Sequence, residues 1–394
     1  TPSVDEALDR LQSGKPTEAD FKILLSASGP KADSKLRTAA VTYIPLYFDD
    51  FAKQQKPALE TMAQLSKSDE EGVRNNAVLN IKKNLSKFIA YDKKQVSEIL
   101  INCLGDENDQ IAAIASESIQ RDLIADEDFK STIFNDLQKY QPKSQSNLIK
   151  LITKNIQFNE ENVDQLLSVL EVAFKASVVD GLFLYRKNRK YIDNEKFQPL
   201  VDQLFQRLEN SLKDEKNIKD VSEELLVPLF KFTKTLGNDS TTRLLGIIAK
   251  YVIPHFNDLE TSKQIEVIRK IANVSSYADT DTLLTGIYDN IFLNFPTENK
   301  GPINFSIIEA TLYAFINLAR KFNSTASKLI GTTLCYTGQP GEFDEENDNE
   351  EKHADFRKRV EYISSIAPDF VNNYDARIKS LKGQKPEGEE ERNK

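Results

Sequence analysis

Hydrophobic positions in the first third of the chain recur at helical spacing, and the whole pattern repeats. The clearest copy is D-x-x-x-V-R-x-x-A-x-x-x-I over residues 69–81, which places its apolar residues on one face of a helix. Similar copies flank it over residues 36–44 and 111–119. The equivalent positions Arg37, Arg74 and Ala112 are separated by 37 and 38 residues, which is close to the period of helical-repeat proteins.

This period predicts the fold class. A single helix pair cannot bury its apolar face alone, so neighbouring pairs stack and share one extended core. We therefore predict an all-α protein, namely an α-solenoid of stacked antiparallel helix pairs whose first half is HEAT-like. Proteins of this class present surfaces to partners rather than a closed pocket to a substrate.

Four residues are interpreted as structural repeat positions. Ala77 is small and lets the neighbouring helix approach closely. Asp69 stands at the start of its helix, where a negative charge complements the exposed backbone amides. Arg74 is expected to reach a carboxylate in the adjoining repeat, and Arg37 holds the equivalent place one repeat earlier.

Composition shifts predict the domain organisation. Residues 1–208 form the first set of helical repeats, and the polar segment 209–224 separates it from a second set at 225–382. An acidic loop at 338–355 interrupts the second set and is expected to be disordered. Residues 383–394 form a charged tail.

Helices are predicted at further apolar stripes. One over Ser34–Phe51 contains Pro45, which should kink it. Residues 160–206 indicate two helices. In the second half the predicted helices are Leu225–Leu236, Thr241–Tyr251, Ser262–Asn273, Thr280–Phe295, Phe305–Phe322 and Phe356–Leu381.

The chemistry of the chain argues against an enzyme. It contains no glycine-rich phosphate-binding motif, and its two histidines, His255 and His353, are too few for a metal site of their own. We expect no catalytic, cofactor-binding or metal-binding residues. Cys103 and Cys335 lie far apart in sequence, Cys103 within an apolar run, so a disulfide framework is not expected.

The net charge of −9 makes extensive binding to the phosphates of a nucleic acid unexpected. No apolar run is long enough to cross a bilayer, so no membrane partner is expected. No secretory leader is visible, and a first residue other than Met indicates a processed or cut chain.

The densest basic cluster is a candidate contact patch formed by Arg186, Lys187, Arg189 and Lys190. Tyr185 and Tyr191 flank it. One interpretation is a surface for an acidic partner or a nucleic acid. The favoured one is a solvated helix end, where cations complement the helix dipole.

The stretch Phe305–Phe322 is apolar on almost every side. Phe305, Ile308, Leu312, Phe315 and Ala319 mark one face, whereas Ile307, Tyr313 and Ile316 point elsewhere. Such a helix is usually buried on several sides. We favour core packing over an exposed groove.

Three segments together resemble the apoptosis inhibitor five family, also called the antiapoptosis clone eleven proteins. They are Lys35–Phe48, Asp69–Ile81 and Phe305–Lys321. The last contributes Phe305, Ser306, Glu309, Leu312, Tyr313, Phe315, Leu318, Arg320 and Lys321.

The resemblance implies a HEAT-like first half and an armadillo-like second half. It implies a nuclear, non-enzymatic scaffold, present also in the cytoplasm, that restrains cell death and is linked to RNA processing or mRNA export. Implied partners are a DEAD-box RNA helicase, the chromatin-condensation factor Acinus and a fibroblast growth factor. Two alternatives remain open: a nuclear transport or trafficking adaptor, and a helical-repeat protein that binds RNA directly.

The chain departs from the family pattern near its end. The family's heptad-spaced leucines correspond here to Val360, Ala367, Tyr374 and Leu381, and Pro368 interrupts the run. These positions should pack inward rather than form a zipper, so a monomer is expected. The further helices and basic tail of the family are not reached by Lys394, and we expect a trimmed form of a longer protein.

Overall fold

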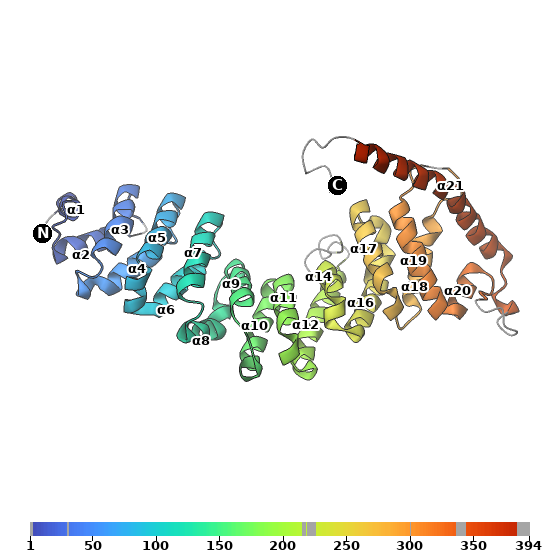
Figure 1. The fold of residues 1–394 in the computed structure, drawn as a ribbon, viewed down its shortest axis with the longest axis horizontal. Coiled ribbons are helices and arrows are strands. Elements are labelled where there is room, and N and C mark those ends of the chain that lie inside the picture. The colour runs from blue at the N-terminus through green and yellow to red at the C-terminus, as the bar shows by residue number, and fades with distance from the viewer. Residues whose placement is uncertain are drawn as a thin grey trace. The chain divides into compact units, whose positions relative to one another are not determined.

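The structure is a computed structural model that describes residues 3–29, 31–214, 218, 226–299, 301–335 and 344–383. Within α21 it leaves out the side chains of residues 374, 377, 378 and 380–383. Throughout these described ranges the regular secondary structure is helical, which confirms the all-α prediction. The chain divides into two compact units, Thr1–Leu204 and Phe205–Lys394. Each unit is a stack of helices (Figure 1).

The first unit consists of eleven described helices and the start of a twelfth. They are α1 Val4–Gln12, α2 Glu18–Ala27, α3 Ser34–Tyr47, α4 Gln55–Leu65, α5 Glu71–Lys83, α6 Leu85–Cys103, α7 Asp109–Asp122, α8 Glu127–Asp136, α9 Pro142–Asn155, α10 Val163–Ala176, α11 Val178–Asn188 and α12 Asn194–Leu212. Short 3₁₀ turns, η1 Ala52–Gln54, η2 Leu137–Lys139, η3 Glu160–Asn162 and η4 Arg189–Tyr191, join some of them.

These helices pack in two rows. The odd-numbered row runs α3, α5, α7, α9 and α11, each helix contacting the next. The even-numbered row runs α2, α4, α6, α8 and α10 in the same way. Most consecutive helices, from α1 to α7 and from α9 to α11, also contact each other across the rows (Figure 1). This is the predicted solenoid arrangement.

The repeated sequence pattern forms the core of this unit. Its alanine and isoleucine positions on α3, α5 and α7 are fully buried: Ala40, Ile44, Ala77, Ile81, Ala115 and Ile119. An alanine without a long side chain allows the facing helix to approach, and the isoleucine one turn later fills the space between rows. Burial of the same two positions in three successive repeats explains why the pattern recurs.

The second unit repeats the two-row plan with helices of more varied length. They are α14 Val227–Lys231, α15 Thr233–Leu236, α16 Asn238–Tyr251, α17 Thr261–Val274, α18 Thr282–Asn290, α19 Phe305–Lys321, α20 Asn323–Ile330 and α21 Glu350–Gly383. The 3₁₀ turns are η7 Ile253–Asp258, η8 Ser275–Tyr277, η9 Phe292–Asn294 and η10 Glu345–Asn347. Helices α16, α18 and α20 form one row, and α17 packs on α19 in the other.

The long helix α21 lies against this unit through aromatic contacts. Phe356 stacks on Phe292 with ring centroids 5.2 Å apart, and Phe370 stacks on Phe305 at 4.2 Å. Arg359 pairs with Asp355 one turn earlier and donates to the carbonyl of Phe295. Much of the remaining described surface of α21 is exposed.

Several predicted boundaries were wrong. Residues 160–206 hold three helices rather than two, because the stretch Leu182–Tyr191 is itself mostly helical, in α11 and η4. The predicted helix Ser34–Phe51 continues through Pro45 but ends at Tyr47. Thr280–Phe295 and Leu225–Leu236 each divide into two shorter elements.

The predicted disordered acidic loop 338–355 was also wrong in its second half. Helix α21 begins at Glu350, where Asn349 accepts the backbone N–H of Lys352 at 3.0 Å. Glu350 and Glu351 complement the first-turn amides, so the acidic run starts a helix there. Residues 338–343 lie outside the described residues, as do 215–217 and 219–224 of the predicted boundary and 384–394 of the tail.

The family's heptad positions fall on α21. Val360 and Ala367 are half-buried, and the side chains of Tyr374 and Leu381 lie outside the described residues. Pro368 lies inside the helix. None of the helices described has the length and apolar composition needed to cross a membrane.

Helix α6 contains a break that its sequence pattern did not predict. Asp92 leaves helical geometry, with φ −148° and ψ 87°. Its carboxylate accepts the backbone N–H of Gln95 at 2.9 Å, so it caps the second half of the helix. Local hydrogen bonding by one aspartate therefore interrupts an otherwise continuous stripe.

Gly246 lies near the middle of α16, and its replacement by alanine is expected to stabilise the protein. A Cβ at Gly246 meets no heavy atom within 4 Å, so alanine fits without strain. Gly246→Ala should raise the free energy of unfolding by about 0.5–1 kcal/mol, because glycine loses more backbone entropy in a helix. Urea unfolding followed by circular dichroism measures the change.

Gly331 in the same unit serves as the opposite control. It has a φ of +77°, and a Cβ there lies 2.5 Å from the Asn349 carbonyl oxygen. Gly331→Ala should therefore destabilise the protein. Loss of stability in the Gly246 variant contradicts the entropic argument.

The first helix pair is joined by an ion pair between the partly exposed Arg10 and the buried Asp20, and its contribution to stability depends on pH. Asp20 has a fully buried side chain and accepts hydrogen bonds from Arg10 Nε at 2.9 Å, Arg10 Nη2 at 2.6 Å and Thr17 N at 2.9 Å. The Arg10 hydrogen bond, followed by those from Thr17, outweighs burial and holds the pKa of Asp20 far below its usual range. A lowered folded-state pKa stabilises the fold above the unfolded pKa of about 3.9, and this contribution is lost as the pH falls.

Asp20→Asn should therefore have a lower unfolding free energy than the wild type at pH 7. The difference between the two unfolding free energies should become smaller below about pH 4. Urea midpoints at pH 7, 5 and 3 measure that difference. A difference that stays constant over this range means that the carboxylate is not the group responsible.

Candidate interaction surfaces

Arginine–carboxylate pairs join successive repeats of the first unit at the turns before the odd-row helices. Arg37 on α3 is 7% exposed and donates to Asp69 at 2.5 Å, to Glu70 and to Ser68 Oγ at 2.9 Å. Asp69 and Glu70 precede α5. The hydrogen bond from Arg37 is the main reason that the pKa of Asp69 is lowered.

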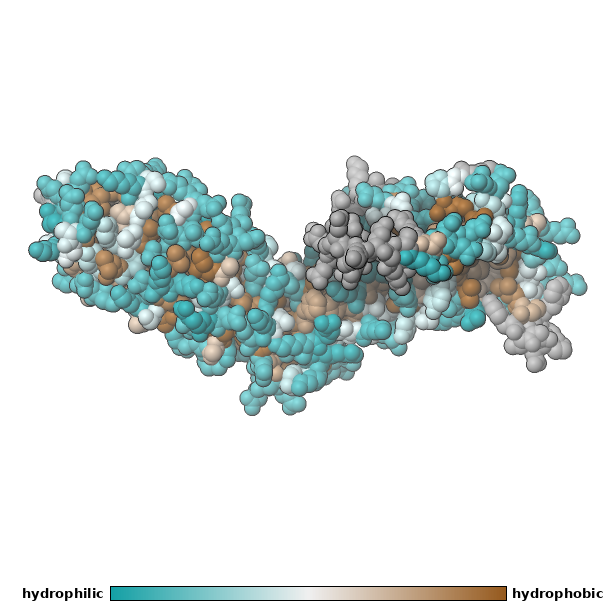
Figure 2. All heavy atoms as spheres, turned by 45° about the horizontal axis from the view of Figure 1, so that its top comes forward, coloured by the Kyte–Doolittle hydropathy of each residue, from teal (hydrophilic) through white to brown (hydrophobic). Residues whose placement is uncertain are grey.

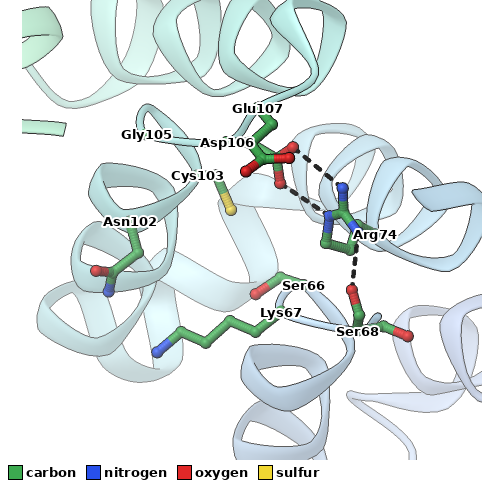
Figure 3. A pocket seen from close by; sticks show the side chains of 9 residues that line it. All are labelled: Ser66, Lys67, Ser68, Arg74, Asn102, Cys103, Gly105, Asp106 and Glu107. Carbon is green, nitrogen blue, oxygen red and sulfur yellow. Dashed lines mark hydrogen bonds and ion pairs between the residues drawn. The ribbon is translucent and has the colours of Figure 1, made fainter. Parts of the chain in front are cut away.

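Arg74 makes the same connection one repeat later. Its Nε donates to Asp106 at 2.9 Å, its Nη2 donates to the same carboxylate at 3.3 Å, and its Nη1 donates to the Ser68 carbonyl at 2.9 Å (Figure 3). Asp106 raises the pKa of Arg74. In both repeats the arginine and its aspartate are 32 residues apart, so these pairs fix the register of the stack.

A cavity of about 350 Å³ lies beside the Arg74–Asp106 pair. Lys67, Asn102, Cys103 and Glu107 are among its lining residues, and Figure 3 shows the thiol of Cys103 close to the ion pair. Burial raises the pKa of Cys103 to about 12, so the thiol stays protonated at neutral pH and is a poor nucleophile. Because Arg74 and Asp106 pair with each other at its edge, we interpret this cavity as part of the junction between repeats.

The four residues of the predicted basic patch lie at the end of α11 and in η4. All four are exposed. The Arg186 guanidinium lies 4.8 Å from the centroid of the Phe183 ring, and Lys190 Nζ lies 4.6 Å from that of Tyr191. Lys187 donates to the Thr153 carbonyl on α9, and Arg189 interacts with the hydroxyl of Tyr185. The patch therefore borders a second helix, α9. The sequence-based prediction considered residues 182–191 alone and did not anticipate this neighbour.

An apolar surface on α19 contradicts part of the core-packing prediction. Ile308, Ala314, Phe315, Leu318 and Ala319 are buried, but Tyr313 is 58% exposed and Ile316 is 48% exposed. Tyr277, at the end of η8, which packs on α19, is also exposed. The space-filling view shows hydrophobic residues gathered in the part of this unit that holds α19 and α21 (Figure 2).

A cavity of about 290 Å³ adjoins this surface between α17 and α19. It is lined by Arg269, Ala272, Asn273, Glu309, Ala310 and Tyr313. Arg269 also donates to Ser306 at 3.2 Å. Exposed tyrosine, isoleucine and arginine around a shallow cavity match the composition of protein–protein contact sites. We refer to Tyr277, Tyr313, Ile316 and Arg269 as the α19 surface.

The two histidines lie apart from these surfaces. His255 Nδ1 is 3.3 Å from Asp258, and His353 lies in the first turns of α21. Within the described ranges no three His, Cys, Asp or Glu residues are grouped as a metal site requires. Cys103 is buried, as predicted, whereas Cys335 is exposed.

Stacked helix pairs with exposed polar and apolar faces define the chain as a helical-repeat protein. The chain belongs to the family described as Apoptosis inhibitory protein 5 (API5), because the sequence profile of that family matches residues 193–394, just over half of the chain. The resemblance stated from three short segments is thereby confirmed.

Two curated relatives extend the similarity over most of the chain. The chain is 24% identical over 396 residues to the Apoptosis inhibitor 5-like protein API5 of Oryza sativa subsp. japonica, covering 89% of this chain and 69% of the relative. It is 22% identical over 377 residues to the Apoptosis inhibitor 5 homolog of Dictyostelium discoideum, covering 87% of this chain and 60% of the relative.

The Arg74–Asp106 pair predicts a large effect of a single substitution. Both side chains are mostly buried, so Arg74→Met leaves a carboxylate without its partner in a poorly hydrated site. The unfolding free energy should fall by about 2–4 kcal/mol. Urea unfolding measures this loss.

Arg121→Met on α7 is the matched control, because Arg121 pairs with Asp122 in a more exposed position. Exposed pairs contribute about 0–1 kcal/mol, so the control should remain close to the wild type. Equal effects of the two substitutions contradict a role of Arg74 in holding the repeats together.

Proposed function

We propose that this chain is a non-enzymatic scaffold that restrains cell death by holding protein partners on its helical-repeat surfaces. Membership of the Apoptosis inhibitory protein 5 family supports the link to cell death. The single structural observation that carries the scaffold role is the α19 surface, where aromatic and aliphatic side chains remain exposed on an otherwise well-packed helix.

The α19 surface has the features of a partner-binding site. Tyr313 and Ile316 are three residues apart, so they lie on the same face of α19 about one turn from each other. Both side chains are about half exposed, so burying the remainder on binding contributes roughly half of the about 1.5–3 kcal/mol gained from a fully exposed apolar side chain. Arg269 and Glu309, which line the adjoining cavity, offer charged groups at its rim.

The partners and the location belong to the same proposal. We infer that the chain acts in the nucleus, and in part in the cytoplasm, alongside proteins of RNA processing or mRNA export. A DEAD-box RNA helicase, Acinus and a fibroblast growth factor are the partner classes to be tested. The chain acts in this proposal as a monomer without a cofactor.

Affinity purification with crosslinking mass spectrometry from nuclear extract tests this proposal. The wild type should recover RNA-processing proteins, with crosslinks from Lys270, which follows Arg269 in sequence, or from Lys321, which donates to the carbonyl of Ser276 beside Tyr277. The variant Tyr313→Asp with Ile316→Asp should lose at least about tenfold of the recovered partner, since two buried apolar contacts are replaced by charge.

Leu46→Asp provides the matched control. Leu46 is 56% exposed, but it lies on α3 in the first unit. The control should keep the partners. Equal recovery of partners by the wild type and the α19 variant would contradict a role of the α19 surface in binding. If the wild type recovers no RNA-processing protein, the named partners are wrong.

A further inference from the structure

Two neighbouring helices of the first unit carry an excess of positive charge. Helix α9 contains three lysines, Lys143, Lys150 and Lys154, and no carboxylate. Helix α11 with η4 contains four cations and one carboxylate, Asp180. The chain as a whole has a net charge of −9, so this is a local departure from the average.

The stack brings the two sets of cations side by side. Helices α9 and α11 pack against each other (Figure 1). Ser146 on α9 donates to Asp180 on α11 at 2.6 Å, and Lys187 on α11 donates to the Thr153 carbonyl on α9. The exposed faces of these two helices are therefore adjacent.

The cations on these faces form a regular array. Lys150 and Lys154 are one turn apart on α9, and Arg186 and Lys190 are one turn apart at the end of α11 and in η4. All four are exposed. Four residues of an α-helix rise about 6 Å, and packed helices lie about 8–10 Å apart. We call Lys150, Lys154, Arg186, Lys187 and Lys190 the α9–α11 basic surface.

Nearby carboxylates neutralise this array only in part. Asp180 accepts the Ser146 hydroxyl and lies 4.0 Å from Lys150, with a side chain that is only 12% exposed. Glu117, on the adjacent helix α7, pairs with Lys82 at 2.6 Å. The exposed acids Asp193 and Glu195 follow η4, but together with Asp180 they make only three carboxylates beside the seven cations of α9, α11 and η4.

Planar groups lie among the cations. The Arg186 guanidinium covers the half-buried Phe183 ring, and Lys190 lies over the half-buried Tyr191 ring. A guanidinium plane or an aromatic ring can stack on a base only if that base is not enclosed in a duplex. An acidic peptide would use the charges but not these planes.

We propose that the α9–α11 basic surface binds single-stranded nucleic acid. Lys150, Lys154 and Lys190 face the phosphates, and the stacked Arg186 and Phe183 take an unpaired base. Recognition is by charge and stacking, so it depends on salt more than on base sequence. This activity is separate from the proposed scaffold role, because it uses another surface in another unit.

Fluorescence anisotropy with the full chain and a labelled U20 oligonucleotide, at 50–200 mM salt, tests the proposal; a dT20 arm distinguishes RNA from DNA. The variant Lys154→Glu with Lys190→Glu should bind at least about tenfold more weakly, and its log–log salt slope should shrink by about 0.7 per cation lost. Phe183→Leu, which removes only the ring, should weaken binding about fivefold or more.

The control is Lys53→Glu with Lys56→Glu, which changes the net charge equally at two exposed lysines outside the surface. It should bind like the wild type. Four outcomes overturn the proposal: no wild-type binding at 50 mM salt, an equal loss in the control, tighter binding of a 20-base-pair duplex, or equal competition by polyglutamate per charge. Thermal unfolding of each variant is compared with that of the wild type. An unchanged unfolding temperature shows that a loss of binding is not caused by misfolding.

Discussion

The shared burial of one apolar stripe between neighbouring helices is the constraint on which the rest of the molecule depends. Ala40, Ala77 and Ala115 are fully buried at equivalent places on α3, α5 and α7. Each small side chain allows the next pair to approach, and each pair completes the core of the previous one. Because the core lies between the rows, described helices such as α9, α11 and α19 keep exposed side chains on their outward faces. Those faces are available for binding.

The ion pairs at the turns add register to this packing. Dispersion and hydrophobic burial do not specify how far one helix slides along another, whereas a two-bond arginine–carboxylate contact does. Arg74 makes that contact to Asp106, and Arg37 divides its two bonds between the neighbouring acids Asp69 and Glu70. In the next repeat, on α7, Ala112 takes the arginine's place. In the repeat after that, on α9, Gln145 stands there and donates to the Leu137 carbonyl, while Ser146 donates to Asp180. The repeat pattern weakens in the sequence where this charge pair is replaced.

Sequence periodicity predicted the helices of the core, but it did not predict features that depend on contacts with neighbouring groups. The stripes of α3, α5 and α7 were found because their apolar positions recur every helical turn. The break at Asp92 was missed because one side-chain hydrogen bond causes it, and such a bond leaves the stripe intact. Exposure of Tyr313 and Ile316 was missed because an apolar sequence does not reveal which side of a helix lacks a neighbour.

The full extent of the α9–α11 basic surface could not be predicted from the sequence either. Only the packing of α9 on α11 brings Lys150 and Lys154 next to the cluster at 186–190. The helix dipole accounts for cations at the end of α11 but not for Lys150 in the middle of α9.

The net charge of the chain and the charge of this surface act over different distances. At physiological ionic strength the screening length is about 8 Å, so a bound polyanion interacts chiefly with the cations beneath it. Carboxylates elsewhere contribute to the net charge of −9 but are largely screened from that site. At low salt their repulsion reaches further and opposes the approach of a polyanion, even as contacts with the surface strengthen. A negatively charged chain can therefore carry a local polyanion site, and its selectivity comes from the spacing of cations and planar groups rather than from total charge.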